Sequence, residues 1–217
     1  MAKKRKHFPS KIQKIEYRGA VEGFQEEKYF KHLASLIEEE PKRKYDVRFK
    51  LTNVEGGSPL VVARKASNQQ SAGKIDRIAV FDFDLLPKEY AQAIDHCKKN
   101  QVVAAYSNMC FDLWLLLHKT SYNKGVVKSE AYQEEVIQAY GLKKGDNIKS
   151  EEIMEQIVSQ ITLKDVCYAV KRGNEIEETN KQFRTPLYTE KSIQYFENPD
   201  LNIHHFVKKV LQKTKIK

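Results

Sequence analysis

The sequence predicts an α/β fold with parallel central strands, followed by a helical C-terminal portion. Up to about residue 120, strand-like and helix-like stretches alternate. Two strand-like stretches in this region are almost continuously apolar, as expected for strands that helices cover on both faces. Beyond residue 121, one helical pattern follows another. We therefore predict an α/β core over residues 10–120 and a helical portion over 121–217 that packs on the core and ends in a basic tail.

The first half of the core is predicted to form a strand, a helix, a strand and a further helix. Residues 15–22 have the pattern of a short strand. A helix follows from about residue 26 until Pro41, because apolar residues recur there at helical spacing. These residues are Tyr29, Phe30, Leu33, Leu36 and Ile37. Residues 47–51 alternate between apolar and basic side chains, which is the period of a half-buried strand. Residues 60–72 are ambiguous, and we favour a helix.

The second half of the core is predicted to repeat the alternation. Residues 75–83 contain a long apolar run and form a central strand. Pro87 opens a helix, since proline is favoured at the first helical position. A second buried strand at residues 101–106 precedes a helix at residues 111–118, which Ser107 or Asn108 could cap.

The C-terminal portion is predicted to be a succession of helices. Their expected ranges are 129–140, 150–161, 163–171 and 200–212. The last helix carries an apolar stripe along one side and basic residues elsewhere. We expect this helix to pack against the sheet or against a partner.

Positive charge is concentrated at the two ends of the chain. The net charge of the 217 residues is +9. Residues 1–6 contribute four cations and residues 208–217 contribute five, with no acids in either segment, so residues 7–207 are electrically balanced. These segments are either solvated tails or the place where the phosphates of a nucleic acid bind.

Several protein classes are excluded by composition. No apolar run approaches the ~20 residues that cross a bilayer, and no signal sequence is recognisable at the N-terminus, so we expect a cytoplasmic protein without membrane contact. Cys97, Cys110 and Cys167 are widely spaced. Neither a disulfide framework nor a zinc knuckle is therefore expected.

Three carboxylates follow predicted strands of the core. Glu22 ends the first strand, and Asp82 and Asp84 end the third. Ligands of parallel α/β sheets bind outside the carboxyl ends of the strands. Asp82 and Asp84 would point to the same side while Phe83 enters the core, and a Mg²⁺ ion would offset their repulsion. The alternative is that both aspartates are ordinary turn residues.

The combination of motifs resembles a known family. The segment Val21-Glu22-Gly23 with Glu26, followed by Asp82-Phe83-Asp84, resembles a TOPRIM domain, which is a Rossmann-like sheet. The segment from Ser107 to His118 closely resembles the signature of the RloB-like family. Its final element is similar to Glu197-Asn198-Pro199 with Ile203, His204 and Val207, so the resemblance spans residues 15 to about 211.

This resemblance implies a function. RloB-like proteins are TOPRIM proteins of bacterial phage defence and abortive infection, often encoded beside an ATPase gene. The implied activity is cleavage of DNA or RNA, tRNA included, with Mg²⁺ or Mn²⁺ as cofactor. The chain contains no Gly-x-x-x-x-Gly-Lys-Ser/Thr motif, so ATP-driven control would need a separately encoded ATPase partner. A homodimer is compatible with this interpretation.

The resemblance also implies roles for single residues. Glu22 matches the TOPRIM glutamate, a general acid/base or metal ligand, and Asp82 and Asp84 match the metal-binding pair. Glu26 matches a second acid. Asp112 stands where relatives carry glutamate, and we expect it, rather than His118, to face the metal.

Other polar residues are candidates for substrate contacts. Ser107 and Asn108 would cap a helix or bind a phosphate. His118 would either support a metal ligand or contact the substrate, or it is a buried histidine at a helix end. Lys74 and Arg77 flank the strand that carries the aspartates, where they either meet a phosphate or lie on the surface. The pair His204-His205 lacks the spacing of a zinc motif.

The sequence therefore predicts a TOPRIM-type metal-dependent endonuclease with Glu22, Asp82 and Asp84 as catalytic residues. The alternative is a non-catalytic effector or regulatory subunit that binds a partner ATPase. Cleavage of nucleic acid that stops with EDTA would distinguish the first from the second.

Overall fold

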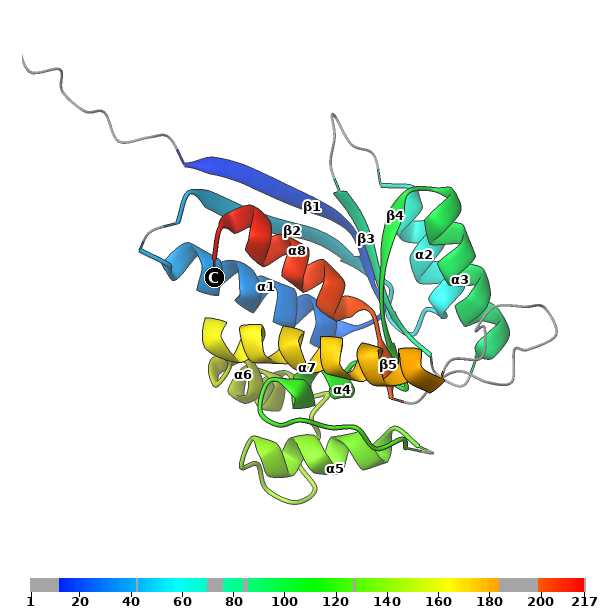
Figure 1. Cartoon of the computed structure of the whole chain (residues 1–217), viewed down its shortest axis with the longest axis vertical. Coiled ribbons are helices and arrows are strands. Elements are labelled where there is room, and N and C mark those ends of the chain that lie inside the picture. The colour runs from blue at the N-terminus through cyan, green and yellow to red at the C-terminus, as the bar shows by residue number, and fades with distance from the viewer. Residues whose placement is uncertain are drawn as a thin grey trace, which may run out of the picture.

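A five-stranded sheet lies at the centre of the molecule, in the order β2-β1-β3-β4-β5 (Figure 1). The structure is a computed structural model that describes residues 12–41, 43–69, 76–83, 86–126, 128–183 and 199–216. The strands are β1 (Gln13–Val21), β2 (Tyr45–Asn53), β3 (Asp76–Asp82), β4 (Val102–Asn108) and β5 (Asp200–Leu201). Strands β1 to β4 run parallel, as predicted from the alternation of strands and helices.

Strand β5 comes from the C-terminal portion and occupies Asp200 and Leu201, so the helix predicted over residues 200–212 was wrong at its start and begins at Ile203 instead. Strand β5 pairs antiparallel with the end of β4, where Leu201 lies opposite Ser107 and Asp200 opposite Asn108. With two residues, β5 is too short to show the alternating pattern by which a strand is recognised. The C-terminal portion thus supplies the last strand of the sheet.

Helices cover both faces of the sheet (Figure 1). They are α1 (Phe24–Glu39), α2 (Pro59–Ser67), α3 (Pro87–Lys99), α4 (Asp112–Leu117), α5 (Glu130–Ala139), α6 (Glu151–Ser159), α7 (Leu163–Phe183) and α8 (Ile203–Thr214). Helices α2 and α3 lie on one face, and α1 and α8 lie on the other. Helix α7 packs beside α8, and α5 lies outermost, next to α4.

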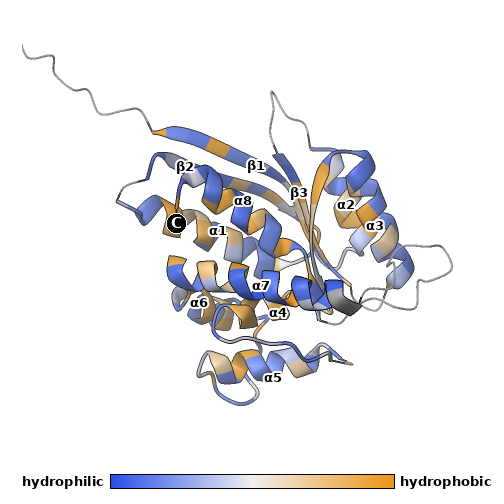
Figure 2. Cartoon of the chain, viewed as in Figure 1, coloured by the Kyte–Doolittle hydropathy of each residue, from blue (hydrophilic) through white to orange (hydrophobic). Residues whose placement is uncertain are grey.

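Aromatic side chains fill the layer between the sheet, α1 and α8. The ring of Tyr17 stacks on Phe49 and meets the edge of Phe206, which also contacts Phe30. Phe206 belongs to the buried face of α8, so this helix packs on the sheet, which is the first of the two positions expected for it. Figure 2 shows hydrophobic residues on the sides of the helices that face the sheet.

Gly19 allows β1 and β3 to come close together. A Cβ atom at this position would lie 1.7 Å from the carbonyl oxygen of Ile78, its neighbour on β3. No side chain can be accommodated at that distance without a shift of the strands. The central strands, whose ends carry Glu22 and Asp82, therefore depend on a glycine here.

Two helix predictions differ from the structure. Helix α7 extends to residue 183, well past the expected 171, because ion pairs stabilise its polar second half, among them Lys171–Glu175 and Lys181–Glu177. Ser107 and Asn108 do not cap α4, since both belong to β4 and the residue that precedes α4 is Phe111. The helix predicted at residues 60–72 is confirmed as the shorter α2.

The described basic residues from 208 onward belong to helix α8 and its C-cap. They are Lys208, Lys209, Lys213 and Lys215. Lys209 and Lys213 both form ion pairs with Asp76 at the start of β3. The sequence pattern correctly indicated a helix but not this partner, which is distant in the sequence. Residues 1–6 lie outside the described residues.

Two sequence-based exclusions agree with the structure. All three cysteines are free thiols, with Cys97 and Cys110 buried and Cys167 half-buried. In the part of the chain that the structure describes, no helix has both the length and the apolarity needed to cross a bilayer.

Candidate functional site

The carboxyl ends of β1 and β3 bring Glu22 and Asp82 together. Glu22 directly follows β1, and its backbone N–H donates to the carbonyl oxygen of Val80 on β3 (3.1 Å). The Glu22 side chain then turns toward the end of β3, where its Oε2 accepts the backbone N–H of Asp82 (3.0 Å). The carboxylate of Glu22 is thereby fixed at the end of the strand that carries Asp82.

Asp82 connects β3 to the segment before α4. The Asp82 side chain is 8% exposed, and its Oδ2 accepts the backbone N–H of Phe111 (3.0 Å). One residue on, the N–H of Phe83 donates to the carbonyl oxygen of Ser107 on β4 (3.1 Å). Phe83 itself packs on Tyr90, so its predicted position in the core is confirmed. Asp84 lies outside the described residues.

A second pair of carboxylates, Glu26 and Asp112, adjoins the first. Glu26 is four residues after Glu22, and Asp112 follows Phe111, whose N–H binds Asp82. Glu26 is 4% exposed and Asp112 is 1% exposed. The backbone N–H of Gly23 donates to Oε2 of Glu26 (3.1 Å), and Gln25 Nε2 donates to Oδ1 of Asp112 (3.1 Å). These bonds hold both carboxylates in place near the N-termini of α1 and α4.

Burial changes the acidity of this second pair. Burial, with a contribution from the negative charge of Asp112, raises the pKa of Glu26 to about 7, despite opposing hydrogen bonds. Burial also raises the pKa of Asp112, against the hydrogen bonds from Gln25 and Cys110. The positive charge of Lys149 acts in the opposite direction on both carboxyls. At neutral pH the site therefore favours a cation or a proton beside Glu26.

Cys110 lies between the two carboxylate pairs. Its Sγ donates to Oδ2 of Asp112 (3.4 Å). Burial, together with the negative charges of Asp112 and Asp82, raises the pKa of the Cys110 thiol well above its usual value. This thiol is consequently protonated at neutral pH and is a poor nucleophile or metal ligand.

His118 and Arg77 lie away from these carboxylates. His118 is buried, with Nδ1 2.8 Å from the carbonyl oxygen of Trp114 and Nε2 3.2 Å from the hydroxyl of Tyr29. Burial lowers the pKa of His118 to about 4, so the ring is uncharged. Arg77 sits at the opposite end of β3 from Asp82.

The guanidinium of Arg77 connects secondary-structure elements. It donates to the carbonyl oxygens of Ser67 and Asn100, at 2.6 Å each, and so ties the C-terminal ends of α2 and α3 to β3. Lys74, the other basic residue predicted to flank this strand, lies outside the described residues.

Ser107 and Asn108 lie at the carboxyl edge of the sheet, next to Asp82 and β5. Ser107 is the β4 neighbour of Asp82, and Asn108 is opposite Asp200. Asp200 was not singled out in the sequence, because only the pairing of β5 with β4 brings it to this edge. Gln25 and Lys149 were also missed, since each acts on carboxylates that are distant in the sequence.

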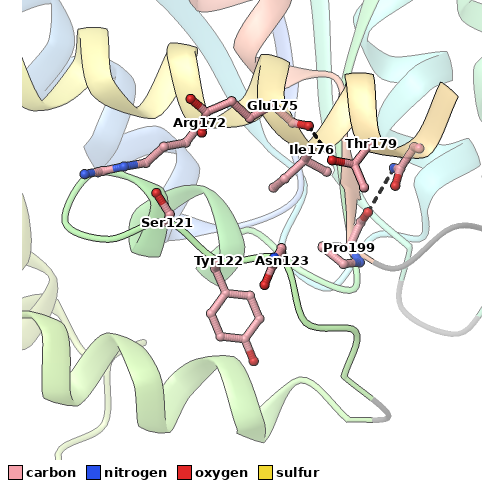
Figure 3. A pocket seen from close by; sticks show the side chains of 9 residues that line it. Ser121, Tyr122, Asn123, Arg172, Glu175, Ile176, Thr179 and Pro199 are labelled. Carbon is pink, nitrogen blue, oxygen red and sulfur yellow. Dashed lines mark hydrogen bonds between the residues drawn. The ribbon is translucent and has the colours of Figure 1, made fainter. Parts of the chain in front are cut away.

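A separate pocket of about 210 Å³ lies between α7, the segment 121–123 and Pro199 (Figure 3). Its charged lining residues are Arg172 and Glu175. Arg172 already donates to the carbonyl oxygen of Leu117 (2.6 Å), while Asn180 donates to that of Pro199 (3.0 Å). These bonds hold the pocket wall together. Because Arg172 and Asn180 already bind backbone carbonyls, the pocket offers fewer groups for a ligand than the carboxylate edge does.

The described residues of the carboxylate edge offer oxygen atoms from Glu22 and Asp82. Glu22 and Asp82 supply oxygen ligands of the type that Mg²⁺ and Mn²⁺ prefer, and Asp84 follows two residues later. Asp112 begins α4 and directly follows Phe111, whose backbone N–H donates to Asp82. In the described residues, a group of three potential ligand atoms within 4.8 Å of one another occurs elsewhere, at Glu177, His204 and His205.

The fold and the position of the carboxylates are typical of α/β proteins that bind ligands at the carboxyl ends of parallel strands. The chain belongs to the RloB-like protein family, whose model matches residues 20–210. The predicted family is therefore confirmed, and the matched region includes both carboxylate pairs and most of α8. No curated protein and no solved structure matches the chain.

Proposed function

We propose that the protein is a metal-dependent endonuclease of the TOPRIM type that cleaves phosphodiester bonds in DNA or RNA. The observation that carries the proposal is the hydrogen bond from the backbone N–H of Asp82 to the Glu22 carboxylate, which places two acidic residues at the carboxyl edge of a parallel sheet. Family membership supports the same conclusion.

Glu22, Asp82 and Asp84 would hold Mg²⁺ or Mn²⁺, with Asp112 as a further ligand or a support behind it. When bound, such an ion polarises the phosphodiester and stabilises the negative charge of the departing oxygen. The residues of the chain orient the reacting groups. Phe111 N–H fixes one oxygen of Asp82, and Asp82 N–H fixes one oxygen of Glu22, so both carboxylates keep their orientation without substrate.

Glu22 is suited to act on the attacking water. It is half-buried, whereas Glu26 and Asp112 are almost fully enclosed. A carboxylate that reaches solvent can position or deprotonate a water molecule next to a bound phosphate. Ser107 and Asn108 border this position but are 1% and 2% exposed, so they support the sheet edge beneath it.

The family also suggests the setting in which the enzyme acts. We propose a role in bacterial phage defence, in which a separately encoded ATPase controls the nuclease and a host RNA such as tRNA or a phage DNA is the substrate. The location is then the cytoplasm, and the nuclease is either a single chain or a homodimer. The missing phosphate-binding loop motif supports a separate ATPase.

Glu22→Gln tests the proposal. The change keeps the shape of the side chain and an oxygen that accepts the Asp82 N–H but removes its basicity. We expect cleavage of a DNA and RNA panel with Mg²⁺ or Mn²⁺ to fall by ~10²–10⁴-fold, the usual contribution of a general base. Asp82→Asn should weaken Mg²⁺ binding in calorimetry. The matched control is Glu38→Gln, an exposed acid on α1.

Two outcomes would contradict the nuclease. One is cleavage that persists in EDTA, and the other is full biological activity of the Glu22→Gln protein. The second outcome would favour the non-catalytic effector that binds a partner ATPase, because such a protein needs its docking surface and not the basicity of Glu22.

A further inference from the structure

Two histidines and a glutamate meet where α7 packs against α8. Glu177 lies on α7, and His204 and His205 lie in the first turn of α8. Oε2 of Glu177 is 3.4 Å from Nε2 of His204 and 2.9 Å from Nε2 of His205. One ligand atom from each residue thus lies within 4.8 Å of the other two.

Packing fixes the ring of His204. Its side chain is 0% exposed and lies against Gly173, one turn before Glu177 on α7. A Cβ atom at Gly173 would be 2.7 Å from both Cβ and Cγ of His204, so the helices approach this closely because residue 173 has no side chain. The ring is thereby held with Nε2 toward Glu177.

The Nδ1 atom of His204 is buried and has no hydrogen-bond partner among the described atoms. Nε2 lies 3.4 Å from Oε2 of Glu177. An ion between these two atoms would replace their contact, and the proton of the neutral ring would then be on Nδ1.

The separations suit a tetrahedral ion. Ligand atoms that bind Zn²⁺ at about 2.0–2.1 Å in tetrahedral geometry lie roughly 3.4 Å apart. The distances from Glu177 to His204 and His205, 3.4 and 2.9 Å, are close to that value, and the two histidine ligand atoms lie within 4.8 Å of each other. His205 is 47% exposed, which leaves room for a water molecule as the fourth ligand.

Neighbouring lysines do not block the position. Lys181 lies 3.3 Å from Oε1 of Glu177, the oxygen that does not face the histidines. Its Nζ is also 2.7 Å from Glu178 and keeps that partner if Glu177 binds an ion. The charge of Lys208 acts on His204 from the next turn of α8 and reduces affinity for a cation without occupying the site.

We propose that Glu177, His204 and His205 bind a Zn²⁺ ion that joins α7 to α8. Two imidazoles and one carboxylate are a borderline-soft ligand set that suits Zn²⁺ or Co²⁺ better than Mg²⁺. The site is separate from the carboxylate edge in residues and in ligand chemistry. Its role would be to hold α8 against α7 while α8 covers the sheet.

Titration of the tag-free, full-length protein with Co²⁺ and Zn²⁺ tests this site. We expect one equivalent of Co²⁺ to give the visible absorption of a tetrahedral complex, and Zn²⁺ to displace it. His205→Ala and Glu177→Gln should weaken binding by at least about 100-fold, since loss of an outer-shell group alone costs ~10–100-fold. His205 is exposed, so its variant should remain folded by circular dichroism.

Matched variants separate this site from others. The visible absorption of tetrahedral Co²⁺ should be retained in His96→Ala, a histidine on α3, and also in Asp82→Asn, because oxygen ligands at the carboxylate edge favour octahedral coordination. The proposal is overturned if the wild-type protein binds neither ion, or if His205→Ala and Glu177→Gln bind Co²⁺ as tightly as it does. Loss of binding in Asp82→Asn alone would place the ion at the sheet edge instead.

Discussion

Replacing Glu26 by glutamine should remove a large pH dependence of folding stability. Glu26 is 4% exposed, and burial with the charge of Asp112 raises its pKa from an ordinary 4.5 to about 7. Below pH 4.5 the carboxyl is protonated in the folded and unfolded chains alike. Between pH 4.5 and 7 the unfolded chain loses its proton and the folded chain keeps it, so stability falls as pH rises.

The size of the effect follows from the two pKa values. A pKa change from 4.5 to about 7 corresponds to a loss on the order of 3 kcal/mol of unfolding free energy by pH 8. Glutamine keeps the shape of the side chain and an oxygen that accepts the Gly23 N–H. The stability of Glu26→Gln minus that of the wild-type protein should therefore rise by this amount from pH 4.5 to pH 8.

Urea unfolding without divalent cations, at several pH values, measures this difference. The matched control is Glu38→Gln, whose difference from the wild-type protein should not vary over the same range, because Glu38 is exposed. A difference for Glu26→Gln that is the same at pH 5 and pH 8 would refute the reasoning. It would mean that Glu26 is ionised in the folded protein throughout.

Two further predictions concern the sheet and α8. Gly19→Ala should lower the unfolding free energy by at least about 2 kcal/mol in urea, because its Cβ would lie 1.7 Å from the Ile78 carbonyl oxygen; an unchanged midpoint would disprove the close approach. The double variant Lys209→Ala and Lys213→Ala should cost less than about 1 kcal/mol, since both ion pairs are partly exposed. If α8 binds nucleic acid, this double variant should also give a shallower plot of log binding constant against log salt concentration. Its slope should be smaller by about 2 than that of the control, Lys98→Ala with Lys99→Ala on α3. Equal slopes in the two proteins would assign the phosphate contacts elsewhere.

Local sequence patterns were sufficient to predict the two strands, β1 and β3, whose ends carry Glu22 and Asp82. The apolar run before Asp82 and the short strand before Glu22 identify two neighbouring strands, and the parallel topology then brings their carboxyl ends together. Glu26 and Asp112 were named through the family resemblance. Their burial was not predictable, because it depends on how α1 and α4 pack in three dimensions.

Features that join distant segments escaped the sequence analysis. Glu177 lies 27 residues before His204, and no local spacing links them, so the histidine pair alone gave no metal motif. Strand β5 is two residues long and is defined by its pairing with β4. The polar half of α7 has little apolar periodicity, and pairs such as Lys171–Glu175 stabilise it instead.

The pairing of β5 with β4 has a consequence for the order in which the protein is made. Leu201 and Asp200 border Ser107 and Asn108, next to Asp82, although they are synthesised about ninety residues later. A nascent chain that has not yet released residues 199–216 from the ribosome has an incomplete sheet edge and an uncovered sheet face. The edge beside Asp82 and the sheet face under α8 are therefore completed only after residues 199–216 have left the ribosome.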